Sequence, residues 1–404
     1  MDLQFSILVP TRQRPDTLLT TLATLVWQTG DDYEIVVADN CGDEEVAAVV
    51  NAVQQRHPRV KHVRSDRVIP MAENWERGLA ACTGEYVSVL GDDDGFLPST
   101  LDAVRALVAA THARLINWSV HHYWWPDTIV TWNRNRLYVS PGNNQIMWVQ
   151  SRAALIESYR NVVNFGDLPS IYTGFVHRDV INSVIDRYGA YFVPRDMSPD
   201  IISGLINLAY TDRYLISHQA LALRGNSRRS TGTSFWERSL GKERRTDYQR
   251  EEGKTVEQLA HPSMTASENV GFIIAWNKLH LKDLMFPFDN EIQVDLSVLV
   301  RHTIANLNQD PEAYDDNLAD AFRLAEKIGF AVDPKSIPGK AIDARRPLQG
   351  PAGSSANMCI GVNCTLANVF DVAGAARLAE AMSSPMNFRL GSPASVEEPT
   401  RKAG

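Results

Sequence analysis

The first 120 residues alternate between two hydrophobic periods, and this alternation limits the fold more than any other feature of the sequence. Short apolar runs, typical of buried strands, are each followed by a segment in which apolar residues recur at helical spacing. Such an alternation predicts an α/β fold, in which helices cover both faces of a mostly parallel sheet. The expected strands are 5–9, 33–38, 60–63, 85–90 and 114–120, and the expected helices are a segment from Asp16 and residues 44–56, 71–82 and 99–110.

The chain has 404 residues, of which 44% are hydrophobic and 22% are charged, and its formal net charge is −8. This is the composition of an ordinary globular protein of two or three domains, so it excludes a disordered or fibrous protein. The net negative charge argues against a protein that binds nucleic acid through bulk charge. The four cysteines are too scattered for a disulfide framework and are typical of a reducing compartment.

The amino-terminal residues are expected to form a strand rather than a signal peptide. No run of 18 apolar residues occurs, so no spanning helix is expected. We therefore expect a cytoplasmic protein without an integral membrane segment.

Candidate ligand-binding residues follow three of the expected strands, where parallel α/β sheets bind their ligands. No glycine-rich loop of the G-x-G-x-x-G or G-x-x-x-x-G-K-[ST] type is present to hold a pyrophosphate. A divalent cation held by carboxylates would supply the positive charge instead. The residues at the three strand ends are Pro10, Thr11 and Arg12, then Asp39 and Asn40, and finally Asp92, Asp93 and Asp94.

The run of three Asp residues has two interpretations. Carboxylates at the end of a buried strand repel one another unless a cation or hydrogen-bond donors compensate. Mg²⁺ or Mn²⁺ is commonly held by one or two carboxylates together with phosphate oxygens of a nucleotide. The alternative is a solvated turn, in which Asp94 and Gly95 form the bend and the other carboxylates cap the helix that follows.

Three motifs, SILVPTRQRP, EIVVADNCGDEE and NWERGLAACTGEYVSVLGDDDGFLP, occur in this order over residues 4–120. Together they resemble the nucleotide-sugar-binding half of the family 2 inverting glycosyltransferases. The resemblance implies the GT-A fold, with a Rossmann-like, mostly parallel sheet, and a metal-dependent transfer of one sugar from a nucleoside-diphosphate sugar to an acceptor hydroxyl. The expected donor is a UDP-sugar, the expected metal is Mg²⁺ or Mn²⁺, and the acceptor would be a glycan, a lipid-linked molecule or a small molecule.

The same resemblance assigns roles to individual residues. Asp39 would hydrogen-bond the base or ribose, although a turn that leaves the strand also explains it. This chain has Gly91 where the commonest family pattern, D-x-D-D-x-L-x-P, has its first Asp, so the direct metal ligand among the three Asp residues stays open. The implied donor-binding residues are Pro10, Thr11, Arg12, Asp39, Asn74 and Asp92, and the implied metal ligands are Asp93 and Asp94.

Asp200 is the expected general base. An inverting transfer needs a base that takes the proton of the acceptor hydroxyl as its oxygen attacks the anomeric carbon. The family carries this carboxylate at the start of a helix downstream of the metal motif, and the matching stretch here is YFVPRDMSPDIISGLINLAY. The usual Glu-Asp pair is replaced by Pro199 and Asp200. The alternative role for Asp200 is a favourable charge at a helix N-terminus.

Two further segments carry candidate ligand contacts. The stretch LALRGNSRRSTGTSFW contains Arg228, which would reach the diphosphate from a closing loop unless the loop is simply a basic surface. Five tryptophans between residues 118 and 148 form either an acceptor platform or the packing of a β-hairpin. The adjacent His121 and His122 face opposite sides of a strand and are expected to be structural.

The C-terminal third shows no catalytic pattern. It begins with a charge-dense stretch over 237–254, and helices are expected over 268–284 and 311–328. A short strand at CIGVNC and a helix through Met382 follow. This third would form a small helical subdomain, an interface between two copies of the chain, or a cap that recognises the acceptor.

We therefore expect a transferase domain over 1–236, divided at residue 120 into a nucleotide-sugar-binding half and an acceptor half over 121–236, then a mainly helical region over 237–383 and a disordered tail over 384–404. Two other functions stay open. A sugar-phosphate nucleotidyltransferase shares the fold but usually has a glycine-rich loop after the first strand, which PTRQRP lacks. A non-catalytic scaffold with a GT-A-like fold would use the C-terminal third to bind a partner.

Overall fold

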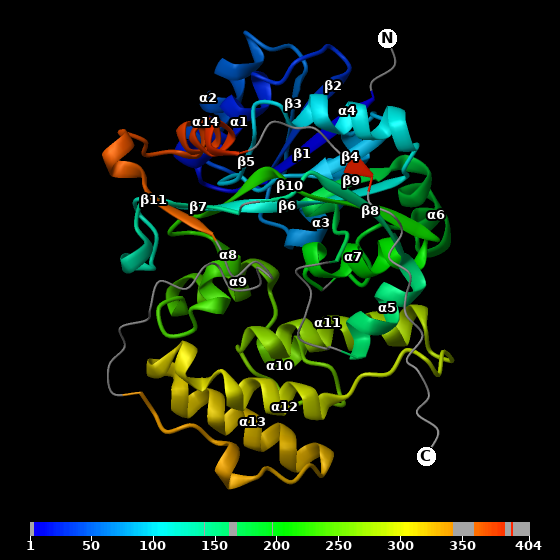
Figure 1. Ribbon diagram of the computed structural model, residues 1–404, viewed down its shortest axis with the longest axis vertical. Helices are drawn as coiled ribbons and strands as arrows, with labels where there is room; N and C mark the ends of the chain where they lie inside the picture. Colours follow the sequence, from blue (N-terminus) through cyan, green and yellow to red (C-terminus); the bar gives the residue numbers. More distant parts are fainter. Residues whose placement is uncertain are drawn as a thin grey trace.

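The strands form one mixed sheet that runs through the middle of the molecule (Figure 1). The computed structural model describes residues 4–140, 142–160, 168–195, 197–341, 359–383 and 389–390. Along the main path the strand order is β12-β8-β10-β6-β9-β4-β1-β2-β3, and β5, β7 and β11 pair beside it.

One half of the sheet is parallel and consists of predicted strands. It contains β1 (Phe5–Thr11), β2 (Tyr33–Asp39), β3 (Val60–Arg64) and β4 (Tyr86–Val89). β1 lies between β2 and β4, and β3 pairs with the other edge of β2, all in parallel. The carboxyl ends of β1, β2 and β4 therefore meet at one edge of the sheet, as the sequence predicts.

The other half of the sheet is mixed. β9 (Gly174–His177) joins the halves, because it is antiparallel to both β4 and β6 (Leu115–Trp124). β6 pairs in parallel with the long strand β10 (Arg213–Asn226), which is antiparallel to β8 (Gln145–Gln150). β5 (Gly95–Phe96) also pairs with β10, so the Asp run before β5 lies beside the end of β10.

Helices cover both faces of the parallel half. Successive residues of β1 point to opposite sides of the sheet, and because the residues on both sides are apolar, each face needs a helix layer to bury it. Ile7 and Val9 share a buried core with one helix layer, whereas Leu8 belongs to the core on the other side. The helices of the first layer are α1 (Pro15–Val26), α2 (Glu44–Gln54) and α4 (Thr100–Thr111), and those of the second are α3 (Met71–Ala81), α5 (Ser151–Arg160), α6 (Arg178–Tyr188) and α7 (Pro199–Ala209).

The predicted helical character of the C-terminal region is confirmed. Its long helices lie on the side of the sheet that carries α7 (Figure 1), and Phe272, Leu299 and Leu324 share a buried core with Leu205 of α7. The helices after β10 are α8 (Thr231–Trp236), α9 (Lys242–Glu252), α10 (Val256–Leu259), α11 (Val270–Met285), α12 (Leu296–Ala305) and α13 (Tyr314–Ile328).

The chain then returns to the N-terminal half. β11 (Ile360–Asn363) pairs with β7 (Arg136–Val139), and α14 (Val372–Met382) packs against α1. Within the expected tail, Arg389–Leu390 form β12 beside β8, and residues 384–388 and 391–404 lie outside the described residues. Single 3-10 turns occur at Thr131–Asn133, Ile171–Thr173, Leu307–Gln309, Pro311–Ala313, Pro334–Ser336 and Cys364–Ala367.

The α/β fold class with a helical C-terminal region is thus confirmed. Among the helices of the described ranges, none combines the length and the apolar composition that crossing a membrane would require.

Candidate active site

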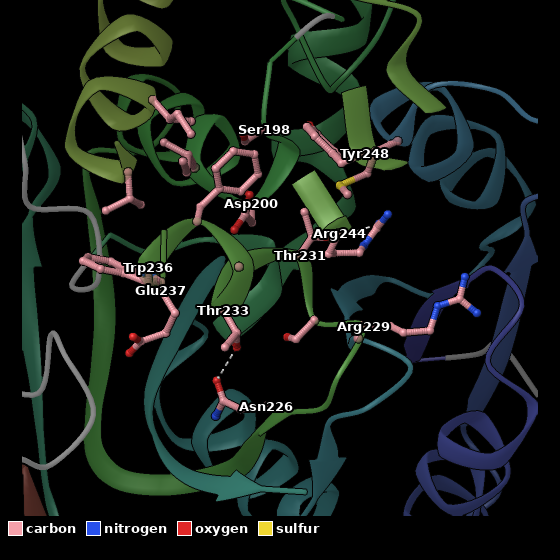
Figure 2. Close-up of a pocket in the computed structure, with 18 of the residues that line it drawn as sticks. Ser198, Asp200, Asn226, Arg229, Thr231, Thr233, Trp236, Glu237, Arg244 and Tyr248 are labelled. Carbon is pink, nitrogen blue, oxygen red and sulfur yellow. Dashed lines mark hydrogen bonds between the residues drawn. The ribbon is translucent and has the colours of Figure 1, made fainter. Parts of the chain in front are cut away.

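A cavity of about 780 Å³ opens between the carboxyl ends of β1 and β4 and the helices of the C-terminal region. Figure 2 shows part of its lining, which comes from β10, α7, α8 and α9 in this view. Asp39, Asp94 and Arg228 are not among the residues that line it. The predicted site residues that do line it are Pro10, Thr11, Arg12, Asn74, Asp92, Asp93 and Asp200.

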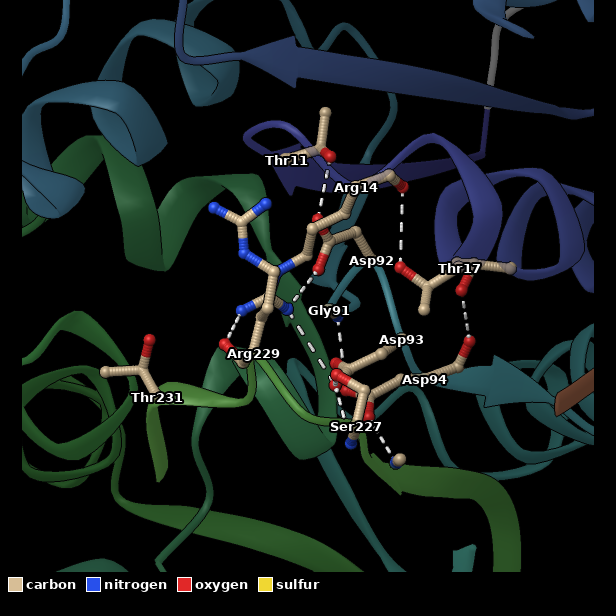
Figure 3. A network of polar contacts seen from close by, with 12 residues as sticks. Thr11, Arg14, Thr17, Gly91, Asp92, Asp93, Asp94, Ser227, Arg229 and Thr231 are labelled. Atoms are coloured by element: carbon tan, nitrogen blue, oxygen red, sulfur yellow. Dashed lines mark hydrogen bonds and ion pairs between the residues drawn. The ribbon is translucent and has the colours of Figure 1, made fainter. Parts of the chain in front are cut away.

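Asp92 and Asp93 converge on one cation, the guanidinium of Arg14 (Figure 3). Arg14 Nη1 lies 2.8 Å from Asp92 Oδ1 and 3.8 Å from Asp93 Oδ2. Thr11 Oγ1, at the end of β1, donates a 2.7 Å hydrogen bond to Asp92 Oδ2. Burial raises the pKa of Asp92, and the adjacent Arg14 charge opposes that rise.

The end of β10 holds Asp93 in place. Ser227 Oγ donates a 2.6 Å hydrogen bond to Asp93 Oδ2, and Trp125 Nε1 donates a 3.0 Å hydrogen bond to the carbonyl oxygen of Asp93. Gly225 passes so close that a Cβ atom there would fall on the same carbonyl oxygen. The close approach of β10 to the Asp run therefore requires a glycine at this position.

Asp94 belongs to the scaffold of the site. Its carboxylate accepts hydrogen bonds from the backbone N–H of Gly225 at 2.6 Å, from that of Gly91 at 3.2 Å, and from the Tyr172 hydroxyl. Burial, together with the Asp93 carboxylate, raises the pKa of Asp94 to about 7. The geometry thus turns Asp92 and Asp93 toward the cavity, whereas the sequence predicted Asp93 and Asp94 as the metal ligands.

Asp39 is fully buried and holds the loop that follows β2. Asp39 Oδ1 accepts a 2.6 Å hydrogen bond from Gly42 N, and Asp39 Oδ2 lies 3.1 Å from His62 Nε2. The next residue, Asn40, lines the cavity instead. At this strand end, the residue that lines the cavity is therefore Asn40 rather than Asp39.

Asn74 lines the cavity from α3, yet its side chain also organises the strand end. Asn74 Nδ2 donates a 2.9 Å hydrogen bond to the carbonyl oxygen of Ala38, and Asn74 Oδ1 accepts one from Arg77 at 2.8 Å. Both polar atoms are engaged by the protein, which favours a positioning role.

Asp200 lies in the first turn of α7 and lines the cavity. Burial raises its pKa, and the charge of Arg224 lowers it in part. Arg224 and His122 are paired residues on β10 and β6, and both line the cavity. Burial and then Arg224 lower the pKa of His122 to about 3, so this imidazole is neutral. The expectation that His122 is purely structural missed its place in the cavity.

Several arginines line the part of the cavity near the Asp run. Arg229 and Arg244 line it together with Arg12 (Figure 2). Glu251 of α9 forms ion pairs with both Arg12 and Arg244, the latter at 3.0 Å. Arg228, which the sequence favoured, is exposed and outside the lining.

The five tryptophans between residues 118 and 148 divide between the two interpretations. Trp124 and Trp132 line the cavity. Trp118 and Trp125 are buried in two separate hydrophobic cores, and Trp148 packs partly buried against one of them. Two of the five therefore line the cavity, and the others are packing residues.

The Asp92 and Asp93 pair fits a divalent cation. Mg²⁺ or Mn²⁺ is commonly held by one or two protein carboxylates and by substrate phosphates, and here two carboxylates already share one cationic group. In the part of the chain that the structure describes, no group of three or more His, Cys, Asp or Glu side chains is arranged to hold a metal ion. The contribution of the protein to such a site would be these two carboxylates.

Sequence reasoning missed Arg14, Tyr172, Ser227 and Glu251. Arg14 belongs to the PTRQRP motif, and its position close to the end of the first expected strand could have marked it as a site residue. Ser227 lay within the arginine-rich stretch. No local sequence pattern identifies Tyr172 or Glu251 as a site residue, because both belong to segments that lie far from the Asp run in the sequence and reach the site only in the folded chain.

Comparison with protein families agrees with these motifs. The model of the family described as glycosyl transferase family 2 matches residues 6–161. An uncharacterized glycosyltransferase of Haemophilus influenzae is 28% identical over 104 residues, which cover 26% of this chain and 34% of the relative. The GalNAc(5)-diNAcBac-PP-undecaprenol beta-1,3-glucosyltransferase of Campylobacter jejuni is 28% identical over 102 residues, which cover 25% of this chain and 33% of the relative. The chain spans about a third of the length of these curated relatives.

Two solved structures are similar at low identity. TarS 1-349 of S. aureus in complex with UDP-GlcNAc is 14% identical, with 82% of this chain and 93% of that chain covered and a TM-score of 0.43. The mannosyltransferase PcManGT of Pyrobaculum calidifontis, in complex with GDP-Man and Mn2+, is 15% identical, with 80% and 87% covered and a TM-score of 0.40. These TM-scores are too low to support an argument. The family match thus covers residues 6–161, which include all three motifs, and over this range the chain is similar to glycosyl transferase family 2.

Proposed function

We propose that this chain is a metal-dependent inverting glycosyltransferase that moves one sugar from a nucleoside-diphosphate sugar, expected to be a UDP-sugar, to an acceptor hydroxyl. One observation carries the proposal. The carboxylates of Asp92 and Asp93 converge on the guanidinium of Arg14 in the same cavity that contains Asp200. The family match and the glycosyltransferase names of its relatives support the reaction class.

In this proposal the strand ends bind the donor. Asn40, Arg12 and Arg229 line the cavity. Asn40 would contact the nucleoside, and the two arginines would contact the diphosphate. Asp92 and Asp93 would hold the divalent cation, which would offset negative charge on the departing diphosphate. A guanidinium is a good partner for phosphate oxygens, because it presents several N–H donors in one plane.

Asp200 is the proposed base. The acceptor oxygen forms a bond to the anomeric carbon, the bond from that carbon to the diphosphate oxygen breaks, and the electron pair leaves with the nucleoside diphosphate. The acceptor proton passes to a carboxylate oxygen of Asp200. A raised pKa suits this role, because a carboxylate whose pKa lies nearer to the working pH holds a proton more readily.

Calorimetric titration with UDP, GDP and dTDP, each with and without Mn²⁺, tests donor binding. We expect one nucleotide to bind in the presence of Mn²⁺ and the Asp93→Ala variant to lose this metal-dependent binding. The Asp200→Asn variant should keep nucleotide binding and lose transfer by about 10²- to 10⁴-fold. Asp316→Asn, a change at an exposed residue of α13, is the matched control.

The absence of metal-dependent binding for all three nucleotides would overturn the enzyme proposal in favour of a non-catalytic scaffold. Undiminished transfer by Asp200→Asn would remove Asp200 as the base and leave the donor site intact.

A further inference from the structure

We propose that the carboxyl ends of β6 and β10 form an oxyanion subsite, and that the acceptor carries a carboxylate or a phosphate that Arg224 binds there. The assignment of this anionic group to the acceptor rests on the proposed function and adds a substrate class to it. The subsite itself follows from the side chains of the two strands.

Four side chains at the end of this strand pair share one face of the sheet. Residues i and i+2 of a strand point to the same side, and the residues paired here are His122 with Arg224 and Trp124 with Asn226. All four line the cavity. Tyr123, which lies between His122 and Trp124 in the chain, is buried in a hydrophobic core instead. The pairing therefore places the four side chains next to one another in the wall of the cavity.

Arg224 differs from the other arginines that line the cavity. Its guanidinium carbon lies 5.9 Å from the centroid of the Tyr172 ring. Among the residues that the structure describes, no oxygen accepts a hydrogen bond from the Arg224 side chain, and no carboxylate forms an ion pair with it. Every other lining arginine is hydrogen-bonded to or ion-paired with an oxygen of the protein, and these are Arg12, Arg14, Arg229, Arg238 and Arg244. The N–H groups of Arg224 are thus available to a ligand.

The neighbouring groups add hydrogen-bond donors. Asn226 Oδ1 accepts a 3.0 Å hydrogen bond from the Thr233 hydroxyl (Figure 2), while Asn226 Nδ2 is buried without a partner. Trp124 Nε1, which can only donate, is also buried without a partner. A buried donor that lacks an acceptor is costly, so both groups favour a ligand oxygen beside them. Together with a guanidinium, they form a set of donors that suits an oxyanion.

The position of Arg224 relative to Asp200 assigns the oxyanion to the acceptor. Burial raises the pKa of Asp200 and the Arg224 charge lowers it in part, so the guanidinium is within electrostatic reach of the proposed base. In the proposed function the donor diphosphate binds the cation at Asp92 and Asp93, whereas the acceptor hydroxyl faces Asp200. An acceptor whose anionic group binds Arg224 would therefore be held with its hydroxyl near the base.

Calorimetric titration of the protein saturated with UDP and Mn²⁺ tests the subsite, because UDP then fills the diphosphate position. The probes are two matched pairs. Methyl β-D-glucuronide differs from methyl β-D-glucoside by a carboxylate in place of the hydroxymethyl group, and glycerol 3-phosphate differs from glycerol by its phosphate. We expect at least one anionic probe to bind at least about tenfold more tightly than its neutral counterpart. The pair that responds distinguishes a carboxylate from a phosphate.

Two substitutions should weaken binding of the anionic probe. Arg224→Met should weaken it by about 10- to 100-fold, as expected for lost hydrogen bonds to a charged group, and should leave the Kd of UDP with Mn²⁺ unchanged. Asn226→Asp keeps the shape of the side chain and replaces donors with a negative charge, so it should weaken the same probe through repulsion. Arg213→Met is the matched control, because Arg213 lies on β10 over the ring of Trp148, is exposed and does not line the cavity. Melting temperatures of the three variants verify that the fold is kept.

The inference is overturned if neither anionic probe binds more tightly than its neutral counterpart, or if both Arg224→Met and Asn226→Asp bind it as wild type does. Loss of UDP binding by Arg224→Met would also overturn it, because Arg224 would then serve the donor diphosphate. If wild type does not bind UDP with Mn²⁺, the proposed function fails. Binding of an anionic probe to the nucleotide-free protein that depends on Arg224 would then still support the subsite, and its absence would overturn the subsite as well.

Discussion

Glu251 is paired with two arginines that a donor diphosphate in the proposed site would also bind. It forms ion pairs with Arg12 and Arg244, and all three side chains are largely buried, with exposed fractions of 16%, 23% and 15%. A diphosphate that binds these guanidinium groups must first break both pairs. We therefore predict that Glu251→Gln strengthens binding of the nucleoside diphosphate.

The magnitude follows from the two pairs. Ion pairs near a protein surface contribute about 0.2–1 kcal/mol each, so two of them oppose the ligand by about 0.4–2 kcal/mol. The amide of Gln keeps one acceptor oxygen and loses the charge, so part of this opposition remains. Since about 1.4 kcal/mol corresponds to a tenfold change in Kd, we expect UDP to bind roughly 3- to 10-fold more tightly.

Calorimetric titration of UDP at saturating Mn²⁺ measures this change. Glu243→Gln is the matched control, because Glu243 lies on the same helix α9, is exposed and does not line the cavity. Melting temperatures of both variants verify that the fold is kept. A Glu251→Gln variant that binds UDP as wild type does, or more weakly, would refute the idea that this carboxylate competes with the diphosphate.

Three further predictions concern the scaffold. Arg14→Ala removes the cation between Asp92 and Asp93, so Mn²⁺ should raise the melting temperature of the variant more than that of wild type; an equal rise would show that Mn²⁺ does not bind there. Gly225→Ala should lower both stability and nucleotide affinity, because the new Cβ displaces the Asp93 backbone; unchanged melting and calorimetric curves would contradict this. Burial lowers the pKa of Lys278 from 10.5 to about 7. Between these two pH values the unfolded chain binds a proton that the folded chain lacks, so the stability of wild type should rise with pH in this window, by up to about 4 kcal/mol. Lys278→Met should abolish that rise in urea unfolding at pH 7 and pH 10 and be more stable than wild type at pH 7; a rise of the same size in the variant would assign it to another group.

Local periodicity was sufficient for the elements that build the parallel half of the sheet. The predicted strand over 33–38 is β2 (Tyr33–Asp39), and the helix predicted over 71–82 is α3 (Met71–Ala81). These elements were predictable because each buries its own apolar face against neighbours in the same α/β unit. The helix that begins with Pro199 and Asp200 was predictable for the same reason, since proline suits the first turn.

The direction of individual side chains at the strand ends was not predictable. Consecutive residues in an irregular turn point in different directions, and the partners that fix them come from distant segments. Asp94 is turned into the scaffold by Gly225 and Tyr172, which lie 131 and 78 residues away along the chain. The position of Arg224 was not predictable either, because the sequence does not show that β10 continues to Asn226 and so directs Arg224 into the cavity.

The sequence by itself determined the fold class, the resemblance to a family and the strand ends that line the cavity, because these depend on local patterns of apolar and polar residues. Only the tertiary structure decided which carboxylates face the cavity, which arginines surround it, and that the C-terminal helices form its other wall. The physical reason is that a cavity is made by contacts between segments far apart in the chain, and a pattern of local periodicity contains no information about those contacts.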